Sequence, residues 1–531
     1  MIKYNFDIYG DKRPLDRYWE HCIGSCHAAT ALRADYRKML EHCHRELGFK
    51  YLRFHGLFDD DMSVVSKPML SNQLVLSFTN IDNIFDFLLS IGMKPFVELS
   101  FMPEALASSN TTIFHYKGNT SPPKDYEKWA WFIGEFIKHI IDRYGRAEVR
   151  SWFFEVWNEP NLGGNGSPYG FWSGDIQEYF RLYKTTAEAI KRCDSQLKVG
   201  GPATSNNAWI PEFLDFCEES GTPVDFVTTH QYPTDCVLGY GVEDSANFVN
   251  PLPLDDNDRV HEVLEMAASG GEEFEAFKKQ YSVFKAQLWE HVERGVLTEM
   301  TKRAVEESRG LPLYYTEWGS LAGLESDSAF GASFIAKTVL DNMNLVKGYS
   351  FWTFCDIIEE SAQDSNEFFG GFGLMTQHGI PKAPYRVFQL LHKLNGELYT
   401  QTYRGETVDI YAVWNHEIHT VQFLAVNHNS LLHNIKTEEI EITVKNGNAF
   451  AADMQRIDGE NANACEKWLQ NGRPEYLSKG QIDILKGESE LKTEKPDIMV
   501  SDNGCTVKFS LPPMGTALIN IYLNELQENK S

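Results

Sequence analysis

Short apolar runs alternate with amphipathic helical segments from about residue 15 to residue 395. The runs carry apolar residues at successive positions, which is typical of parallel strands that are buried on both faces. Eight such strands are predicted, at residues 18–23, 51–55, 94–99, 152–157, 197–201, 225–229, 312–316 and 349–354. Because helices separate them, the pattern predicts a (β/α)8 TIM barrel over residues 15–398, an α/β fold.

The intervening helices are read from apolar positions that recur with a period near 3.6 residues. The clearest runs from Asp125 to Tyr144, with Asp125 as the expected N-cap and Gly145 after its end. A second helix is expected to begin after Asp175. The largest insertion, at about Asp235–Gly310, is rich in Glu and other helix formers, so we expect it to add helices over one rim of the barrel.

The pattern changes after about residue 400. Apolar residues there alternate with polar ones in short β-branched stretches separated by turn residues, which indicates antiparallel strands. These stretches cover residues 408–414, 420–426, 438–444, 505–511 and 517–522. We therefore expect an all-β sandwich domain over residues 399–531, to which residues 1–14 could contribute a strand.

Composition narrows the classes of partner. The chain has 531 residues, 42% of them hydrophobic, and a formal charge of −26, from 49 basic and 75 acidic residues. This charge disfavours binding to nucleic acid or to an anionic membrane surface. No apolar window is long enough to span a bilayer. The N-terminus lacks the pattern of a signal peptide, and the nine cysteines include no Cys-x-x-Cys pair, so a cytoplasmic location is expected. The sequence does not determine the oligomeric state, and a homo-oligomer is one of the possibilities.

Two carboxylates stand at the ends of two predicted core strands. Residues 152–160 read Trp-Phe-Phe-Glu-Val-Trp-Asn-Glu-Pro, so Asn158 and Glu159 follow an aromatic strand that Pro160 terminates. Residues 313–319 read Leu-Tyr-Tyr-Thr-Glu-Trp-Gly, which ends a second strand at Glu317. The carboxyl ends of barrel strands form the active-site rim. Glycoside hydrolysis needs two such carboxylates, and Glu159 and Glu317 are the predicted catalytic pair.

Other strand ends also carry polar or aromatic residues. His55 ends the second strand, His230 and Tyr232 follow the sixth, and Trp352 lies in the eighth, which leads to Glu360. A sugar site needs such aromatic surfaces and fixed polar groups. His42-Cys43-His44 lies in a helical pattern where adjacent residues point to different faces, so we expect no metal there. The chemistry requires no metal or organic cofactor.

Seven stretches spread over the predicted barrel, together with the β-sandwich after it, resemble glycoside hydrolase family 39, a group of retaining β-xylosidases. They are His55-Gly-Leu-Phe-Asp-Asp60, Pro95-Phe-Val-Glu-Leu-Ser-Phe-Met-Pro103, Ser121-Pro-Pro-Lys-Asp-Tyr-Glu-Lys-Trp129, Phe154-Glu-Val-Trp-Asn-Glu-Pro-Asn-Leu162, Lys198-Val-Gly-Gly-Pro-Ala203, Tyr349-Ser-Phe-Trp-Thr-Phe354 and Gly370-Gly-Phe-Gly-Leu374. The resemblance implies that Glu159 is the acid/base, Glu317 the nucleophile and Asn158 a partner of the sugar 2-hydroxyl. It also implies that the sugar subsite is lined by His55, His230, Tyr232 and Trp352.

The resemblance implies an exo-acting β-xylosidase that takes small oligosaccharides or glycosides as substrates. Phe114, Trp352 and Phe372 are candidates to exclude the hydroxymethyl group that glucose carries and xylose lacks. Related glycosidases for glucose, arabinose or iduronic acid stay open as alternatives, as does an endo-glycanase on the same barrel. An iduronidase needs cationic groups facing the substrate carboxylate, and no Lys or Arg stands at the strand ends quoted above. A carbohydrate-binding role is conceivable for residues 400–531 alone, and a metal-dependent hydrolase would need a third ligand beside His55 and His230.

Overall fold

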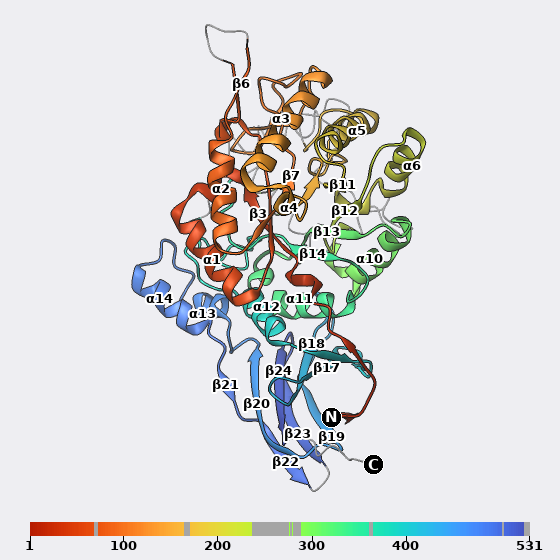
Figure 1. The fold of residues 1–531 in the computed structure, drawn as a ribbon. Coiled ribbons are helices and arrows are strands. Elements are labelled where there is room, and N and C mark those ends of the chain that lie inside the picture. Colours follow the sequence, from red (N-terminus) through yellow and green to blue (C-terminus); the bar gives the residue numbers. More distant parts are fainter. Residues whose placement is uncertain are drawn as a thin grey trace.

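The structure, a computed structural model, places a barrel and a β-sandwich end to end (Figure 1). It describes residues 1–67, 73–163, 170–235, 276, 279, 288–360, 365–501 and 504–524. The predicted insertion at 235–310 lies largely outside the described residues, so its proposed position over the rim stays a prediction. None of the described helices is long and apolar enough to cross a membrane.

The barrel is closed by eight parallel strands, in the order β10-β11-β12-β13-β14-β3-β4-β7, which confirms the predicted fold. The strands are β3 (Cys22–His27), β4 (Tyr51–His55), β7 (Lys94–Glu98), β10 (Phe153–Glu155), β11 (Lys198–Thr204), β12 (Phe226–Gln231), β13 (Leu313–Trp318) and β14 (Gly348–Phe351). Two small hairpins, β5 (Val65–Ser66) with β6 (Val75–Leu76) and β8 (Thr112–Ile113) with β9 (Gly118–Asn119), lie in the loops.

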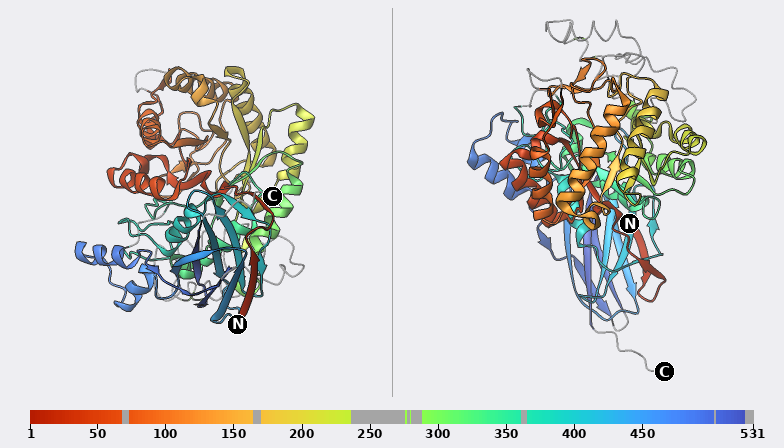
Figure 2. Two further views of the ribbon diagram at one scale, coloured as in Figure 1. Left: turned by 60° about the horizontal axis from the view of Figure 1, so that its bottom comes forward. Right: turned by 45° about the horizontal axis from the view of Figure 1, so that its top comes forward.

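A helix follows each barrel strand and packs outside it, as the views in Figure 2 show. In the described part of the chain these helices are α1 (Ala34–Leu47), α2 (Thr79–Ser90), α3 (Tyr126–Tyr144), α5 (Ile176–Cys193), α6 (Ile210–Ser220), α10 (Val296–Glu307), α11 (Ala329–Asp341) and α12 (Ala383–Lys393), with the short α4 (Arg146–Val149) after α3. The predicted caps are confirmed. The Asp125 side chain accepts hydrogen bonds from two backbone N–H groups of the first turn of α3, and Gly145 follows α3 with a positive φ of 84°.

The first predicted strand is wrong in position. Residues 18–23 were expected to be extended, but Tyr18–Glu20 forms a 3₁₀ turn and β3 begins at Cys22. Tyr18 and Trp19 are nevertheless buried, and the Tyr18 hydroxyl donates to Val339 O at 2.7 Å. A short apolar run does not distinguish a buried turn from a buried strand, which explains the error.

The interior of the barrel is filled in layers, because alternate residues of each strand point inward. The lowest layer is aromatic and contains Phe96, Phe153, Phe226 and Tyr314, whose ring centroids lie 5.1–6.3 Å apart. Two residues further along their strands, Glu98 and Glu155 form a charged layer with Arg53 of β4. The predicted site residues lie above this layer, toward the carboxyl ends of the strands.

The second unit is a sandwich of two sheets. The smaller sheet has the order β1-β19-β23-β22, and the larger has the order β2-β15-β17-β18-β24-β20-β21, with β16 beside β17. Their bounds are β1 (Ile2–Asp7), β2 (Lys12–Pro14), β15 (Glu397–Tyr399), β16 (Tyr403–Arg404), β17 (Val408–Asn415), β18 (Thr420–Asn427), β19 (Glu438–Lys445), β20 (Ala449–Ile457), β21 (Thr493–Glu494), β22 (Asp497–Ser501), β23 (Gly504–Leu511) and β24 (Thr516–Leu523). The five predicted strands are present.

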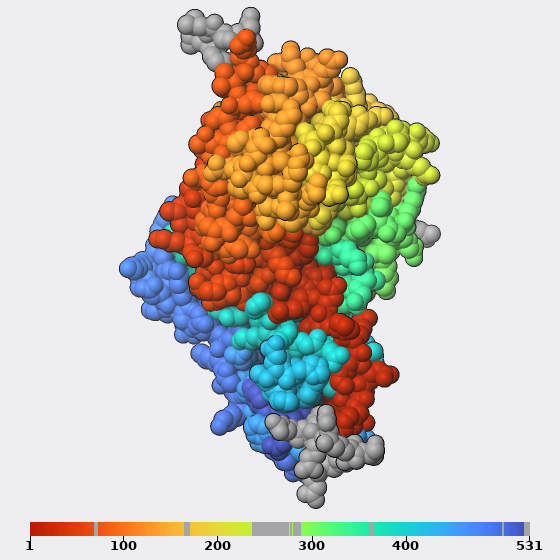
Figure 3. Space-filling model, viewed as in Figure 1, coloured from red at the N-terminus to blue at the C-terminus, as the bar shows by residue number. Residues whose placement is uncertain are grey.

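The N-terminal segment takes part in both sheets. β1 pairs in parallel with β19, and β2 pairs with β15. Figure 3 shows this segment (dark red) on the surface of the sandwich. The domain boundary predicted at 398/399 falls within β15, and its position stays a prediction. Two helices that were not predicted, α13 (Ala464–Gln470) and α14 (Lys479–Glu488), extend from the sandwich toward the barrel beside α1 (Figure 1).

One face of the larger sheet packs against the barrel. On the opposite face of this sheet, side chains that include Val408, Ile410 and Phe423 pack with residues of the smaller sheet and form the sandwich core. Alternate residues of the same strands, including Tyr411 and Leu424, belong to the hydrophobic core of the barrel. Every residue of β17 and β18 is therefore buried, and the barrel and the sandwich share one continuous packed boundary.

Candidate active site

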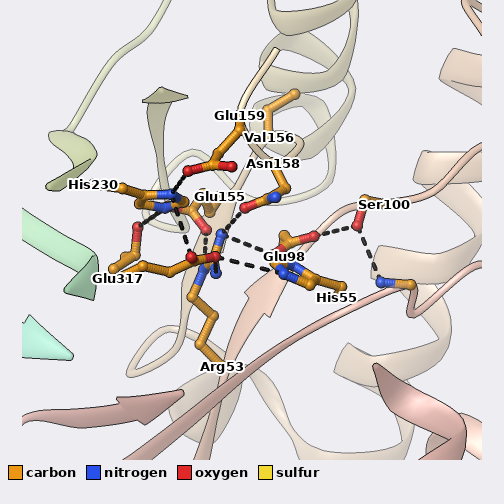
Figure 4. Close-up of polar contacts among 12 residues, drawn as sticks. Arg53, His55, Glu98, Ser100, Glu155, Val156, Asn158, Glu159, His230 and Glu317 are labelled. Atoms are coloured by element: carbon orange, nitrogen blue, oxygen red, sulfur yellow. Dashed lines mark hydrogen bonds and ion pairs between the residues drawn. The ribbon is translucent and has the colours of Figure 1, made fainter. Parts of the chain in front are cut away.

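Glu159 and Glu317 face each other above the charged layer (Figure 4). One carboxylate oxygen of each lies within 4.8 Å of the other and of a His230 ring nitrogen. Both side chains are almost completely buried, with 7% and 4% of their residue surface exposed. This proximity fits the carboxyl separation of about 5–5.5 Å that retaining glycosidases use, rather than the roughly 6.5–9.5 Å of inverting ones.

The backbone holds each glutamate in an irregular conformation. After β10, Trp157 and Glu159 have positive φ angles of 76° and 42°, and Glu159 N donates to Ala203 O at 2.8 Å. In β13 the register against β12 shifts, so that His230 pairs with Glu317 although Thr229 pairs with Tyr315. Such a bulge re-aims a side chain, and here it lets both Thr316 and Glu317 reach into the barrel.

Arg53 is the central cation of the site, and the sequence analysis did not identify it. Its guanidinium donates to Glu155 Oε2 at 2.6 Å, to Glu317 Oε1 at 2.7 Å and to Asn158 Oδ1 at 2.8 Å. The same group lies 2.8 Å from Glu98 Oε2. Arg53 is fully buried, so its charge is compensated entirely by these carboxylates.

The signal for Arg53 was present in the sequence. In Tyr51-Leu-Arg-Phe-His55, Arg53 shares the inward face with His55, two residues before the strand end. Arg53 does not stand at a strand end, where the site residues were expected. The guanidinium already contacts four acceptors, so it offers little to a substrate carboxylate.

A large share of Glu159 stays protonated near neutral pH. Burial raises the pKa of Glu159 to about 7, against the lowering effects of His55, Arg53 and a Ser205 hydrogen bond. The structure gives burial as the main cause, and Arg53 compensates the Glu317 charge at 2.7 Å.

The two histidines contact different carboxylates. His230 Nδ1 lies 2.9 Å from Glu159 Oε1 and 3.7 Å from Glu317 Oε2. Burial lowers the pKa of His230 to about 4, so this ring is neutral at neutral pH. His55 Nδ1 lies 2.7 Å from Glu98 Oε2, and its Nε2 lies 3.5 Å from Glu317 Oε1. Burial lowers the pKa of His55, but the two carboxylates outweigh burial and leave this pKa raised.

Asn158 and Tyr232 complete the polar lining. Asn158 Oδ1 accepts from Arg53, whereas its buried Nδ2 has no hydrogen-bond partner within the described part of the chain. A buried, unpaired amide donor is costly unless a ligand accepts from it. The Tyr232 hydroxyl donates to Glu317 Oε2 at 3.3 Å.

Aromatic residues surround this polar centre. The ring of Trp352 lies 4.6 Å from that of His55, and the Arg53 guanidinium lies 6.0 Å from the Trp352 ring. Phe114 lies at the edge of the site: its ring centroid is 5.3 Å from that of Phe171, which in turn is 6.1 Å from that of His55. Phe171 was not predicted, since it stands in a loop far from any strand end.

The Glu360 carboxyl interacts electrostatically with His55, Glu317 and Glu159. Burial raises its pKa to about 7. The predicted site residues therefore gather at one end of the barrel, with Phe114 at the margin. Trp318 and Gln231 point outward instead, where they hydrogen-bond Tyr349 O and the side chains of Thr301 and Tyr349.

Glu159, His230 and Glu317 are also the group in the described residues whose spacing could accommodate a metal ion. Arg53 already places a positive charge 2.7 Å from Glu317, and a second cation at the same point would be repelled. The donor set therefore fits proton transfer and nucleophilic attack better than metal binding.

Comparisons with known proteins agree with this geometry. The sequence model of glycosyl hydrolases family 39 matches residues 3–269 and 275–504. A beta-xylosidase of Caldicellulosiruptor saccharolyticus is 45% identical over 96% of both chains, and one of Geobacillus stearothermophilus is 32% identical over 89% of this chain and 86% of its own. The crystal structure of a monomeric beta-xylosidase from Caulobacter crescentus CB15 superimposes with a TM-score of 0.79 at 30% identity, covering 98% of this chain and 100% of that one. Since the family match includes both glutamates and extends over nearly the whole length, the chain belongs to glycosyl hydrolases family 39.

Proposed function

We propose that the protein is an exo-acting, retaining β-xylosidase that releases xylose from the non-reducing end of small xylo-oligosaccharides. The observation that supports this most directly is the short distance between a buried Glu159, whose pKa is raised, and an arginine-bound Glu317. The xylose specificity rests on the similarity to the two bacterial relatives named beta-xylosidase.

The proposed reaction is a double displacement. Glu317 attacks the anomeric carbon while Glu159 gives its proton to the departing oxygen, and the C–O bond to the leaving group breaks. Water then attacks the glycosyl-enzyme and Glu159 takes its proton, which frees Glu317. Once Glu317 is esterified its negative charge is gone, so the field of Arg53 favours ionised Glu159 and prepares it to act as a base.

The remaining groups position the sugar. The unpaired Asn158 Nδ2 is suited to donate to the 2-hydroxyl, beside the anomeric carbon. His55, Tyr232 and His230 hold polar atoms around Glu317 and Glu159, and Trp352 gives an apolar surface for the ring. Phe114, Phe372 and Glu360 are proposed to line the outer part of the subsite.

The substrate proposal is tested with aryl glycosides that share one leaving group. We expect kcat/KM on the β-xyloside to exceed that on the β-glucoside at least about 100-fold, or roughly 2.7 kcal/mol of transition-state binding, because bulky aromatic residues clash with the extra hydroxymethyl. Arabinosides and an iduronide complete the panel. Comparable xyloside and glucoside values would refute the xylose specificity and leave the mechanism intact. Oligomeric products in an early xylo-oligosaccharide digest would indicate an endo-glycanase.

The acid/base assignment is tested by Glu159→Ala. Activated aryl xylosides need little protonation, so the variant should keep their first step, whereas poor leaving groups should lose about 10²–10⁴-fold in rate. Azide should then restore turnover and give the β-xylosyl azide, because it replaces the water that Glu159 normally activates. An equal loss for every leaving group, with no azide product, would exclude Glu159 as the acid/base.

A further inference from the structure

The hydroxyl of Thr316 connects the Arg53 network to the catalytic acid. Thr316 Oγ1 donates to Glu155 Oε1 at 2.7 Å and lies 3.0 Å from His230 Nε2. The opposite ring nitrogen, His230 Nδ1, lies 2.9 Å from Glu159 Oε1. Glu155, Thr316 and His230 are fully buried, so no water competes for these contacts.

The proton positions along this chain follow from Glu155. Arg53 Nε donates to Glu155 Oε2 at 2.6 Å, and a carboxylate paired with arginine accepts hydrogen bonds only. The single proton of the Thr316 hydroxyl therefore points to Glu155. The Thr316 oxygen can then only accept from His230 Nε2. A neutral imidazole carries one N–H, so His230 Nδ1 is left with a lone pair that faces Glu159.

We propose that Thr316 and Glu155 are positioning residues that fix His230 in the Nε2–H tautomer, so that its Nδ1 accepts the acid proton of Glu159 in the free enzyme. This rests on the proposed function, in which Glu159 is the general acid. The opposite tautomer would donate from Nδ1 and would stabilise the ionised carboxylate instead. The lowered pKa of His230, caused by burial, keeps the ring neutral as the proposal requires.

Other charged or titratable groups face the same two side chains and stay in place when Thr316 changes. They are Arg53 and His55 of β4, Glu98 of β7, Glu317 of β13, and Tyr232, Asp235 and Glu360 of the loops. A change in the titration of Glu159 after removal of the Thr316 hydroxyl therefore reports on His230 and not on a lost charge.

The test is the pH dependence of kcat/KM, which reports the free enzyme, for an aryl xyloside with a poor leaving group. The basic limb of the wild-type protein should lie near pH 7. Thr316→Val leaves His230 Nε2–H without its acceptor, so the ring is free to donate from Nδ1. The pKa of Glu159 then falls and the limb moves down by about one pH unit, a tenfold loss of kcat/KM above it. Thr316→Ser keeps the hydroxyl and should return the limb to the wild-type position.

A matched control is available on the neighbouring strand. Thr228 of β12 is equally buried, and its hydroxyl has no hydrogen-bond partner among the described residues. Thr228→Val should leave the limb unchanged. If the basic limbs of kcat/KM for Thr316→Val and Thr228→Val lie at the same pH, the proposal is overturned.

Nitrogen-15 NMR of histidine-labelled protein tests the tautomer without any substrate. The His230 signals are those, among the 16 histidines, that disappear in His230→Gln. We expect a protonated Nε2 and an unprotonated Nδ1 in the wild-type protein, and a protonated Nδ1 overturns the proposal. Because this NMR measurement uses the wild-type protein, it tests the tautomer of His230 even if Thr316→Val does not fold. Lack of activity on every xyloside would instead refute the proposed function and leave the tautomer assignment standing.

Discussion

Glu317→Ala is expected to reduce turnover of aryl β-xylosides by about five orders of magnitude or more, since removal of a catalytic nucleophile costs up to ~10⁶ in other hydrolases. Glu317 is the carboxylate that forms the covalent intermediate, and Arg53 at 2.7 Å and Tyr232 at 3.3 Å orient it. No other carboxylate is held in this way opposite Glu159 in the described part of the site. Steady-state release of the aryl leaving group measures the loss, and an unchanged circular dichroism spectrum excludes unfolding.

Azide distinguishes the two glutamates in stereochemical terms. In Glu317→Ala the anion occupies the vacated space, attacks the substrate directly and gives the α-xylosyl azide. In Glu159→Ala it attacks the glycosyl-enzyme and gives the β-anomer. The control is Glu325→Ala, which removes an exposed glutamate eight positions further along and should leave the rate unchanged. Retained turnover in Glu317→Ala, or a β-azide product from it, would show that another residue is the nucleophile.

The barrel could be predicted from the sequence because its strands are buried on both faces. Runs such as residues 152–157 are apolar at nearly every position and lie between two helices with clear caps. The sandwich strand Ala449–Ile457 was missed, since its residues are buried without a regular alternation. Helices α13 and α14 were not predicted either, because few of their residues are buried and their sequences show no clear apolar stripe.

The rim of the active site was predictable and the layer beneath it was not. Parallel strands bring their carboxyl ends together, so Glu159, Glu317, His55 and His230 could be grouped from sequence. The contacts of Arg53 and Thr316 depend on which inward residues share a level across neighbouring strands. Strand tilt and the bulge at Thr316 set that level, and neither is visible in the sequence.

Arg53→Met is expected to destabilise the protein severely. The side chain keeps its bulk, but Glu98, Glu155 and Glu317 lose their shared cation inside the barrel. Breaking one buried ion pair costs about 3–5 kcal/mol, because the remaining charge stays buried without a partner. For a chain of this length that corresponds to a fall in Tm of roughly 5 °C, measured by calorimetry. Arg143→Met, which removes a half-exposed arginine bound to Asp86, is the matched control and should stay close to the wild-type Tm.

The destabilisation should also depend on pH. Burial raises the pKa of Glu98, but His55 and Arg53 outweigh burial and hold this pKa below its ordinary value. A carboxyl whose pKa is lower in the folded state stabilises the fold above its unfolded pKa of about 4.3, and this contribution disappears as the pH falls through the folded value. Arg53→Met removes most of that contribution. The gap in Tm between wild type and variant should therefore be widest near pH 7 and should narrow toward pH 4. A gap that is constant with pH, or a Tm equal to that of Arg143→Met, would mean that Arg53 does not compensate the buried carboxylates.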